Sequence, residues 1–109
     1  MSRVLAWVLL CTVAAPARAD DIFTVPLSLW DRPRSARAVL EQPAVRQAVE
    51  LYLARPAARL VIHHGNGQDP LAQAEEFRAW LMALAIDGAR VSLINDARPN
   101  EALKLEVVK

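Results

Sequence analysis

Hydrophobic and polar residues alternate in two segments, residues 22–30 and residues 101–109. A period of two predicts strands with one buried face. Pro26 lies in the first segment and cannot donate a hydrogen bond to a neighbouring strand, so this strand is expected at a sheet edge or a bulge. Residues 60–62 form a continuous apolar run, typical of a central strand covered on both faces. Val91 and Leu93 alternate with Arg90 and Ser92, which predicts a further strand, the third in chain order.

Two segments between these strands carry apolar residues at helical spacing. Pro43 stands at the first position of one helix, which ends at Arg55-Pro56. Asp69 is a plausible N-cap of the other, with Pro70 at its first position, and this helix is expected to end near Ala85. The two apolar stripes are Val45, Ala48, Val49 and Tyr52, and Leu71, Ala74, Phe77, Leu81 and Leu84.

Polar and glycine-containing stretches separate these elements. Residues 31–35 form a polar break, after which Ser35 could cap a helical turn through Leu40. Residues 63–70 and 95–100 are predicted to be loops, and Gly88 marks a turn. The resulting order is β-α-β-α-β-β. It predicts an α+β fold, a two-layer α/β sandwich with both helices on one face of a mixed four-stranded sheet.

Residues 1–19 have the pattern of an export signal. Arg3 precedes an apolar run, and Ala17-Arg18-Ala19 is a small-x-small cleavage site. The apolar run is too short to span a membrane comfortably. We expect cleavage after Ala19, a periplasmic location and a single domain of residues 20–109, with no transmembrane segment after the signal.

Composition narrows the class of protein. Two of the thirteen basic residues lie in the signal, so residues 20–109 have eleven basic and twelve acidic residues and a net charge of −1. This balance argues against a nucleic-acid partner and against binding to an anionic membrane surface. The single cysteine, Cys11, lies in the signal, so no disulfide is expected in the domain. Leu10 stands where a lipoprotein signal has a small residue, which argues against lipidation of Cys11.

His63 and His64 are the first candidates for chemistry. Adjacent residues leaving a strand point to opposite faces, so the pair is not expected to share a metal ion. A zinc site needs three or four ligands, and only Asp69 lies nearby. We therefore expect no metal and no cofactor. The serines occur in no nucleophile-elbow motif, which argues against hydrolase activity.

A second group of candidates could form a binding surface. Trp30 and Arg34 are residue types favoured at protein-binding hot spots, although Trp30 could instead cover the end of the core. The loop of residues 63–69 lies before a helix N-terminus, but its spacing matches no phosphate-binding motif. The candidate binding residues are Trp30, Arg32, Arg34, His63, His64, Asn66, Asp69 and Arg78.

The segment from Arg55 to Ile62 resembles the helix exit and second strand of OmpA-like peptidoglycan-binding domains. Arg78-Ala79 is similar to an Arg-Ala pair of that family, the run Asp87-Gly88 to its glycine turn, and Asn100 to the asparagine opening its last strand. The resemblance covers nearly all of residues 20–109 in element order. It implies an OmpA-like fold, in which an aspartate and the helix arginine hold the diamino acid of a peptide stem.

The chain departs from that family at the ligand site. Gly67 stands where the family has its ligand-binding aspartate, and Glu101-Ala102 stands where it has two arginines. Asp69 is the only carboxylate near the expected place, and Arg78 could remain as the family arginine. The scaffold is thus expected to be kept and the ordinary site lost or rebuilt.

These observations lead to one main functional hypothesis and three alternatives. The main hypothesis is a small exported envelope protein, a non-enzymatic binding or accessory module. It could instead bind peptidoglycan weakly through Asp69 and Arg78, or be a structural subunit whose strand edge in residues 101–109 pairs with an envelope protein. An enzyme using His63 or His64 is the least favoured reading.

Overall fold

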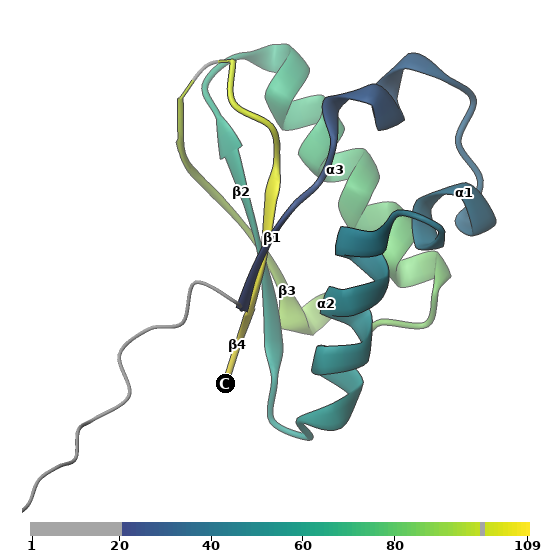
Figure 1. The fold of residues 1–109 in the computed structure, drawn as a ribbon. Helices are drawn as coiled ribbons and strands as arrows, with labels where there is room; N and C mark the ends of the chain where they lie inside the picture. Colours follow the sequence, from purple (N-terminus) through teal and green to yellow (C-terminus); the bar gives the residue numbers. More distant parts are fainter. Residues whose placement is uncertain (1–20, 99) are drawn as a thin grey trace, which may run out of the picture.

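Four strands form one mixed sheet in the order β1-β4-β2-β3 (Figure 1). The strands are β1 (Ile22–Thr24), β2 (Arg59–Gly65), β3 (Val91–Ala97) and β4 (Lys104–Val108). β4 is antiparallel to both β1 and β2, whereas β2 and β3 are parallel. The structure is a computed structural model that describes residues 21–98 and 100–109. The predicted export signal lies outside the described residues.

The helices lie on one face of this sheet. They are α1 (Ala36–Leu40), α2 (Pro43–Ala54) and α3 (Gln68–Ala83), and Figure 1 shows them together on one side of the strands. The predicted two-layer sandwich and mixed four-stranded sheet are confirmed. Two predicted helix starts are confirmed as well. Ser35 Oγ accepts a hydrogen bond from the Ala38 N–H, and Pro43 is the first residue of α2. No helix within residues 21–98 or 100–109 is long and apolar enough to span a bilayer.

The core lies between the sheet and the helices. Alternate residues of β4 are buried, as the period of two predicted. β2 also buries alternate residues, whereas its apolar run predicted a strand covered on both faces. The helices bury one stripe each against them. The largest buried side chains are Phe77, Leu29, Leu60, Ile62, Leu81, Leu103 and Leu105.

The first predicted strand is wrong beyond Thr24. The Val25 N–H still donates to the Leu103 carbonyl at 2.8 Å, but Pro26 has no N–H with which to continue the ladder. The chain turns there into the 3-10 helix η3 (Leu27–Asp31), which buries Leu29. The alternation predicted Leu27 and Leu29 on one buried face, whereas Leu27 is 53% exposed and only Leu29 is buried.

Three boundaries around the predicted loops also need correction. β2 continues to Gly65, so His63 and His64 belong to a strand and not to a loop. α3 begins at Gln68 with Gly67 as its N-cap, which places Asp69 inside the first turn. β3 extends to Ala97, into the stretch predicted to be a turn, because β2 continues to Gly65 and pairs with it there.

The last strand begins at Lys104 rather than at residue 101, and it lies inside the sheet. β4 pairs with β1 on one side and β2 on the other. β1 covers the edge of β4 along residues 104–106, so a partner cannot pair there, contrary to the expectation for residues 101–109. The two edges of the sheet are β1 and β3.

The end of α3 supplies a test of local strain. The Ile86 N–H donates to the Leu81 carbonyl and the Ala85 N–H to the Met82 carbonyl, which is the Schellman pattern. Ala85 stands at the left-handed position with φ of 73°, where glycine is usual. We predict that Ala85→Gly raises the free energy of unfolding by about 0.5–1 kcal/mol in urea titrations.

Ala79→Gly is the matched control for this prediction. Ala79 is exposed in the interior of α3, so glycine there should lower stability by about 1 kcal/mol. If both substitutions lower stability equally, Ala85 is not strained in the folded protein.

Candidate functional site

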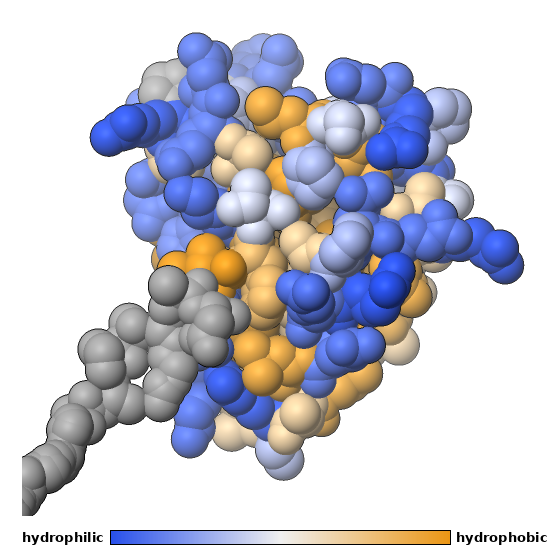
Figure 2. All heavy atoms as spheres, in the orientation of Figure 1, coloured by the Kyte–Doolittle hydropathy of each residue, from blue (hydrophilic) through white to orange (hydrophobic). Residues whose placement is uncertain are grey.

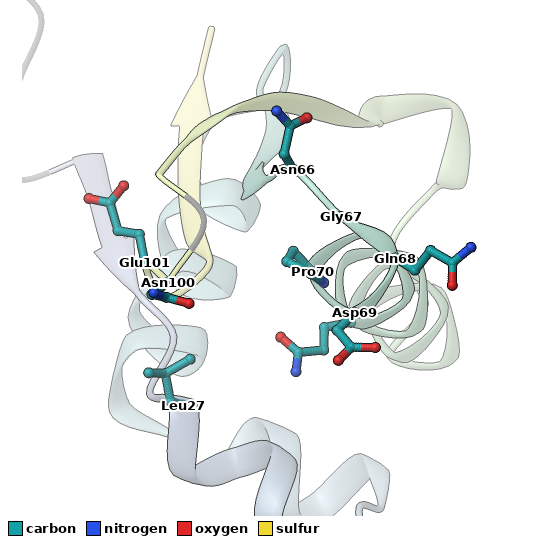
Figure 3. A pocket seen from close by; sticks show the side chains of 9 residues that line it. Leu27, Asn66, Gly67, Gln68, Asp69, Pro70, Asn100 and Glu101 are labelled. Atoms are coloured by element: carbon teal, nitrogen blue, oxygen red, sulfur yellow. The ribbon is translucent and has the colours of Figure 1, made fainter.

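A cleft of about 700 Å³ opens where β2 passes into α3. Figure 3 shows Leu27, Asn100 and Glu101 on one side of it and the start of α3 on the other. Its walls thus come from three segments, namely η3, the β2–α3 connection with the first turn of α3, and the segment before β4. The lining residues are Leu27, Asn66, Gly67, Gln68, Asp69, Pro70, Gln73, Asn100 and Glu101.

The cleft is lined by amide and carboxylate side chains and by no basic side chain. Asn66 Oδ1 accepts a hydrogen bond from Asn95 Nδ2 at 2.6 Å, which fixes one wall to β3. Asp69 is exposed in the first turn of α3, where the helix dipole stabilises a negative charge. These groups can hydrogen-bond a polar ligand and pair with a positive charge on it.

Glu101 is held firmly at the cleft wall. Its carboxylate accepts hydrogen bonds from Lys104 Nζ at 2.7 Å and from the Arg98 N–H at 2.9 Å. The bond from Lys104, followed by that from the Arg98 backbone, lowers the pKa of Glu101 below its ordinary value. Glu101 is therefore ionised at neutral pH, with its charge paired to Lys104.

Gly67 explains why the cleft lacks a carboxylate at the position expected from the family resemblance. Its φ is 110° and its ψ 165°, a region that is essentially restricted to glycine. An aspartate at position 67 would be strained in this connection. Asp69, two residues later, is the carboxylate of the cleft lining that lies nearest to this position in the chain.

Arg78 lies away from the cleft. Its guanidinium donates to the Gly88 carbonyl at 2.9 Å and to the Val91 carbonyl at 3.4 Å, and so fastens the connection between α3 and β3. Asp69 and Arg78 are separated by roughly 14 Å along α3, at ~1.5 Å per residue. The structure therefore does not bring together the two residues expected to hold one diamino acid.

Trp30 and Arg34 are part of the packing between η3 and α3. Arg34 forms an ion pair with Glu76 and lies 5.2 Å from the centre of the Trp30 ring. Trp30 in turn packs edge-on against Phe77, and Trp80 Nε1 donates to Glu76 at 2.9 Å. The hydrogen bond from Arg34 lowers the pKa of Glu76, although burial opposes this.

The interpretation that Trp30 covers the core is therefore confirmed, since it packs against the buried cluster. The guanidinium of Arg34 is bonded to groups of the protein itself. Its Nε and Nη2 donate to the Glu76 carboxylate, and its Nη1 donates to the Trp30 and Arg32 carbonyls. Arg32 is exposed. The predicted surface of residues 30–34 is thus largely an internal anchor of the η3 segment.

His63 and His64 point to opposite faces of the sheet, as predicted. His64 is 5% exposed on the helix side, and its Nδ1 donates to the Gly65 carbonyl at 3.0 Å. His63 lies on the open face between two carboxylates. Its Nδ1 is 2.9 Å from Asp96 Oδ1 and its Nε2 is 2.8 Å from Glu106 Oε1.

An irregularity in the sheet positions Asp96. His64 pairs with Asn95 and Gly65 with Ala97, so Asp96 is an extra residue in β3. Burial lowers the pKa of His63, but the hydrogen bonds to Glu106 and Asp96 and their charges outweigh it and raise that pKa above its ordinary value of 6.5. The imidazolium is therefore favoured between the two carboxylates.

This cluster does not have the geometry of a metal site. Asp96 and Glu106 bond opposite nitrogens of the His63 ring, so the three side chains do not converge on one point. Across residues 21–98 and 100–109, no group of three or more histidine, cysteine or acidic side chains could hold a metal ion.

A second cleft, of about 660 Å³, lies between β1 and α2. Its apolar lining comes from Phe23, Leu51 and Ala54, and an ion pair of 3.5 Å joins Asp21 to Arg55 beside it. Figure 2 shows apolar residues between the sheet and α2, whereas hydrophilic residues dominate the upper end of the molecule, towards the α3 cleft.

Sequence reasoning missed several residues of these sites. Glu106 and Lys104 fall on the polar face of the last strand, so their position on the open face could have been read from the alternation. Asp96 was not a candidate because residues 95–100 were predicted to form a turn, whereas β3 extends through it. Asn100 and Glu101 entered the sequence analysis only through the family resemblance and were not among the candidate binding residues, because tertiary packing brings them to the cleft.

Comparison with known proteins finds no matching family model, no similar curated protein and no similar solved structure. The resemblance to OmpA-like domains thus remains a hypothesis based on the residues quoted above.

The contacts of Arg78 predict a structural role. Arg78→Met keeps an unbranched, flexible side chain and removes both hydrogen bonds to carbonyls, so we expect a loss of about 1–2 kcal/mol in the free energy of unfolding. Arg32→Met, at an exposed site, should change stability by less than about 0.5 kcal/mol. Unchanged stability of Arg78→Met in denaturant titrations would contradict this role.

The His63 cluster predicts a pH dependence of stability. Because the folded-state pKa of His63 is raised, its contribution is fully present below its unfolded pKa and is lost as pH rises through the folded value. The stability difference between the wild type and His63→Gln should therefore shrink between pH 6 and pH 9. A difference that stays constant over this range, measured in urea at each pH, would contradict the prediction.

Proposed function

We propose that this chain is an exported, non-enzymatic binding module of the cell envelope, with its ligand in the α3 cleft. The observation that carries this proposal is the cleft of about 700 Å³, lined by polar side chains from three segments. Concave sites of this size with a few convergent polar groups are the usual form of ligand sites.

The state of the histidines supports binding over catalysis. Both nitrogens of His63 contact carboxylates, so neither is free to take a proton from a substrate. His64 is buried and bonded to a backbone carbonyl. A general base at either position would first have to break these contacts.

The lining favours a ligand that donates hydrogen bonds or carries a positive charge. The cleft offers the carboxylates of Asp69 and Glu101 together with four amide side chains, and no basic side chain. The ammonium and hydroxyl groups of peptidoglycan fit this chemistry, and the resemblance to OmpA-like domains points to the same polymer. Asp69 is the residue we assign to the ligand, because Glu101 is already bonded to Lys104.

Co-sedimentation of the purified protein with peptidoglycan sacculi tests this proposal. Asp69→Asn removes the free carboxylate of the cleft and should abolish saturable binding, since hydrogen bonds to a charged group contribute about 1.5–3 kcal/mol. Asp31→Asn is the matched control, because Asp31 is exposed and lies outside the cleft lining. Unchanged binding by Asp69→Asn would exclude Asp69 as the ligand residue.

A further inference from the structure

His63 ties three strands together just where the walls of the cleft leave the sheet. It stands on β2, and its ring joins Asp96 on β3 to Glu106 on β4. β2 ends at Gly65, and the next residue, Asn66, already lines the cleft. β3 ends at Ala97, from where the chain runs to Glu101 on the opposite wall.

A second set of contacts links the same cluster to that wall. A hollow of about 200 Å³ on the open face is lined by His63, Asp96, Lys104 and Glu106, and also by Glu101. Glu101 lines the cleft as well and accepts a hydrogen bond from Lys104, the β4 residue paired with His63. Glu101 therefore lines both the hollow beside His63 and the cleft beside α3.

The chemistry of imidazole makes the arrangement depend on a proton. Protonated histidine donates from both ring nitrogens and can bond Asp96 and Glu106 together. Neutral histidine donates from one nitrogen only, so its other nitrogen would face a carboxylate lone pair. Loss of the proton therefore removes one of the two strand contacts.

We propose that His63 is a proton-dependent clasp that sets the position of the cleft walls, closed when the ring is protonated and loosened when it is neutral. The inference rests on the proposed function, since it describes regulation of the same cleft. Weakening of the contact to Asp96 or to Glu106 leaves the end of β2 held to β3 or to β4 by the backbone ladder alone. Asn66 and Glu101 then shift relative to each other.

The charges around His63 are few. Asp96 faces it from β3, Glu106 and Lys104 from β4, and Glu101 from the segment before β4. β1 contributes the uncharged Ile22. On β2 itself, Arg59 lies at the far end of the strand, with its guanidinium 3.5 Å from the Ala89 carbonyl. The carboxylates raise the pKa of His63 above 6.5, so the clasp should open only above that pH.

Nuclear magnetic resonance of the ¹⁵N-labelled protein between pH 5.5 and 9 tests this proposal without a ligand. We expect the amide signals of Asn66, Gly67 and Glu101 to titrate together with the His63 imidazole, with one shared midpoint above 6.5. His63→Gln should remove this titration from the amides. Glu106→Gln removes one carboxylate and should lower the midpoint, whereas Glu75→Gln, on the exposed side of α3, should leave it unchanged.

The outcomes separate this inference from the proposed function. Cleft amides that stay fixed through the His63 titration, or that still titrate in His63→Gln, would overturn the clasp. If the amides follow His63 but sacculi are not bound at pH 6 or pH 8.5, the clasp stands and the proposed ligand is wrong. Stronger sacculus binding at pH 6 than at pH 8.5, with the difference lost in His63→Gln, would support both.

Discussion

Strand β2 lies between β3 and β4 and supplies Leu60 and Ile62 to the core, so most of the structure depends on how it is paired. Burial of two such side chains contributes about 1.5–3 kcal/mol each. Once Leu60 and Ile62 face the helices, the period of two places His64 among buried residues and His63 on the open face. A shift of the register by one residue would exchange the two histidines and expose the apolar set, and this cost fixes the register.

The same strand determines where the cleft can form. β2 is parallel to β3, so both run to the same end of the sheet, and the antiparallel β4 starts there. The segments that leave β2 and lead into β4 must therefore meet beside the first turn of α3, as Figure 3 shows. The polar lining follows from this position, because connections at the end of a sheet stay near solvent and their polar groups need not be buried.

Much of the fold could be predicted from periodicity, and the reasons for the failures are physical. The alternation of β4 is a strong signal because it buries one continuous face. The α3 stripe is confirmed at Ala74, Phe77 and Leu81, but Leu71 at its start is 40% exposed. The first strand failed because Pro26 ends the ladder and the chain turns into η3, where only Leu29 is buried. His63 and His64 looked like loop residues because glycines follow them, whereas pairing with two neighbouring strands keeps them in β2.

The candidate site was less predictable, because most of its chemistry arises between segments distant in sequence. Asp69 and Asn66 were found by their place before a helix, but Trp30 and Arg34 proved to be occupied by Glu76 and Phe77. Gly67 shows how the fold and the candidate site are connected. Its left-handed backbone lets the chain turn from β2 into α3, and that same backbone excludes an aspartate at this position. Arg78 is bonded to backbone carbonyls away from the cleft, and the polar side chains of the cleft lining are carboxylates and amides. The binding proposed for this cleft therefore favours ligands with ammonium or hydroxyl groups over ligands with carboxylates.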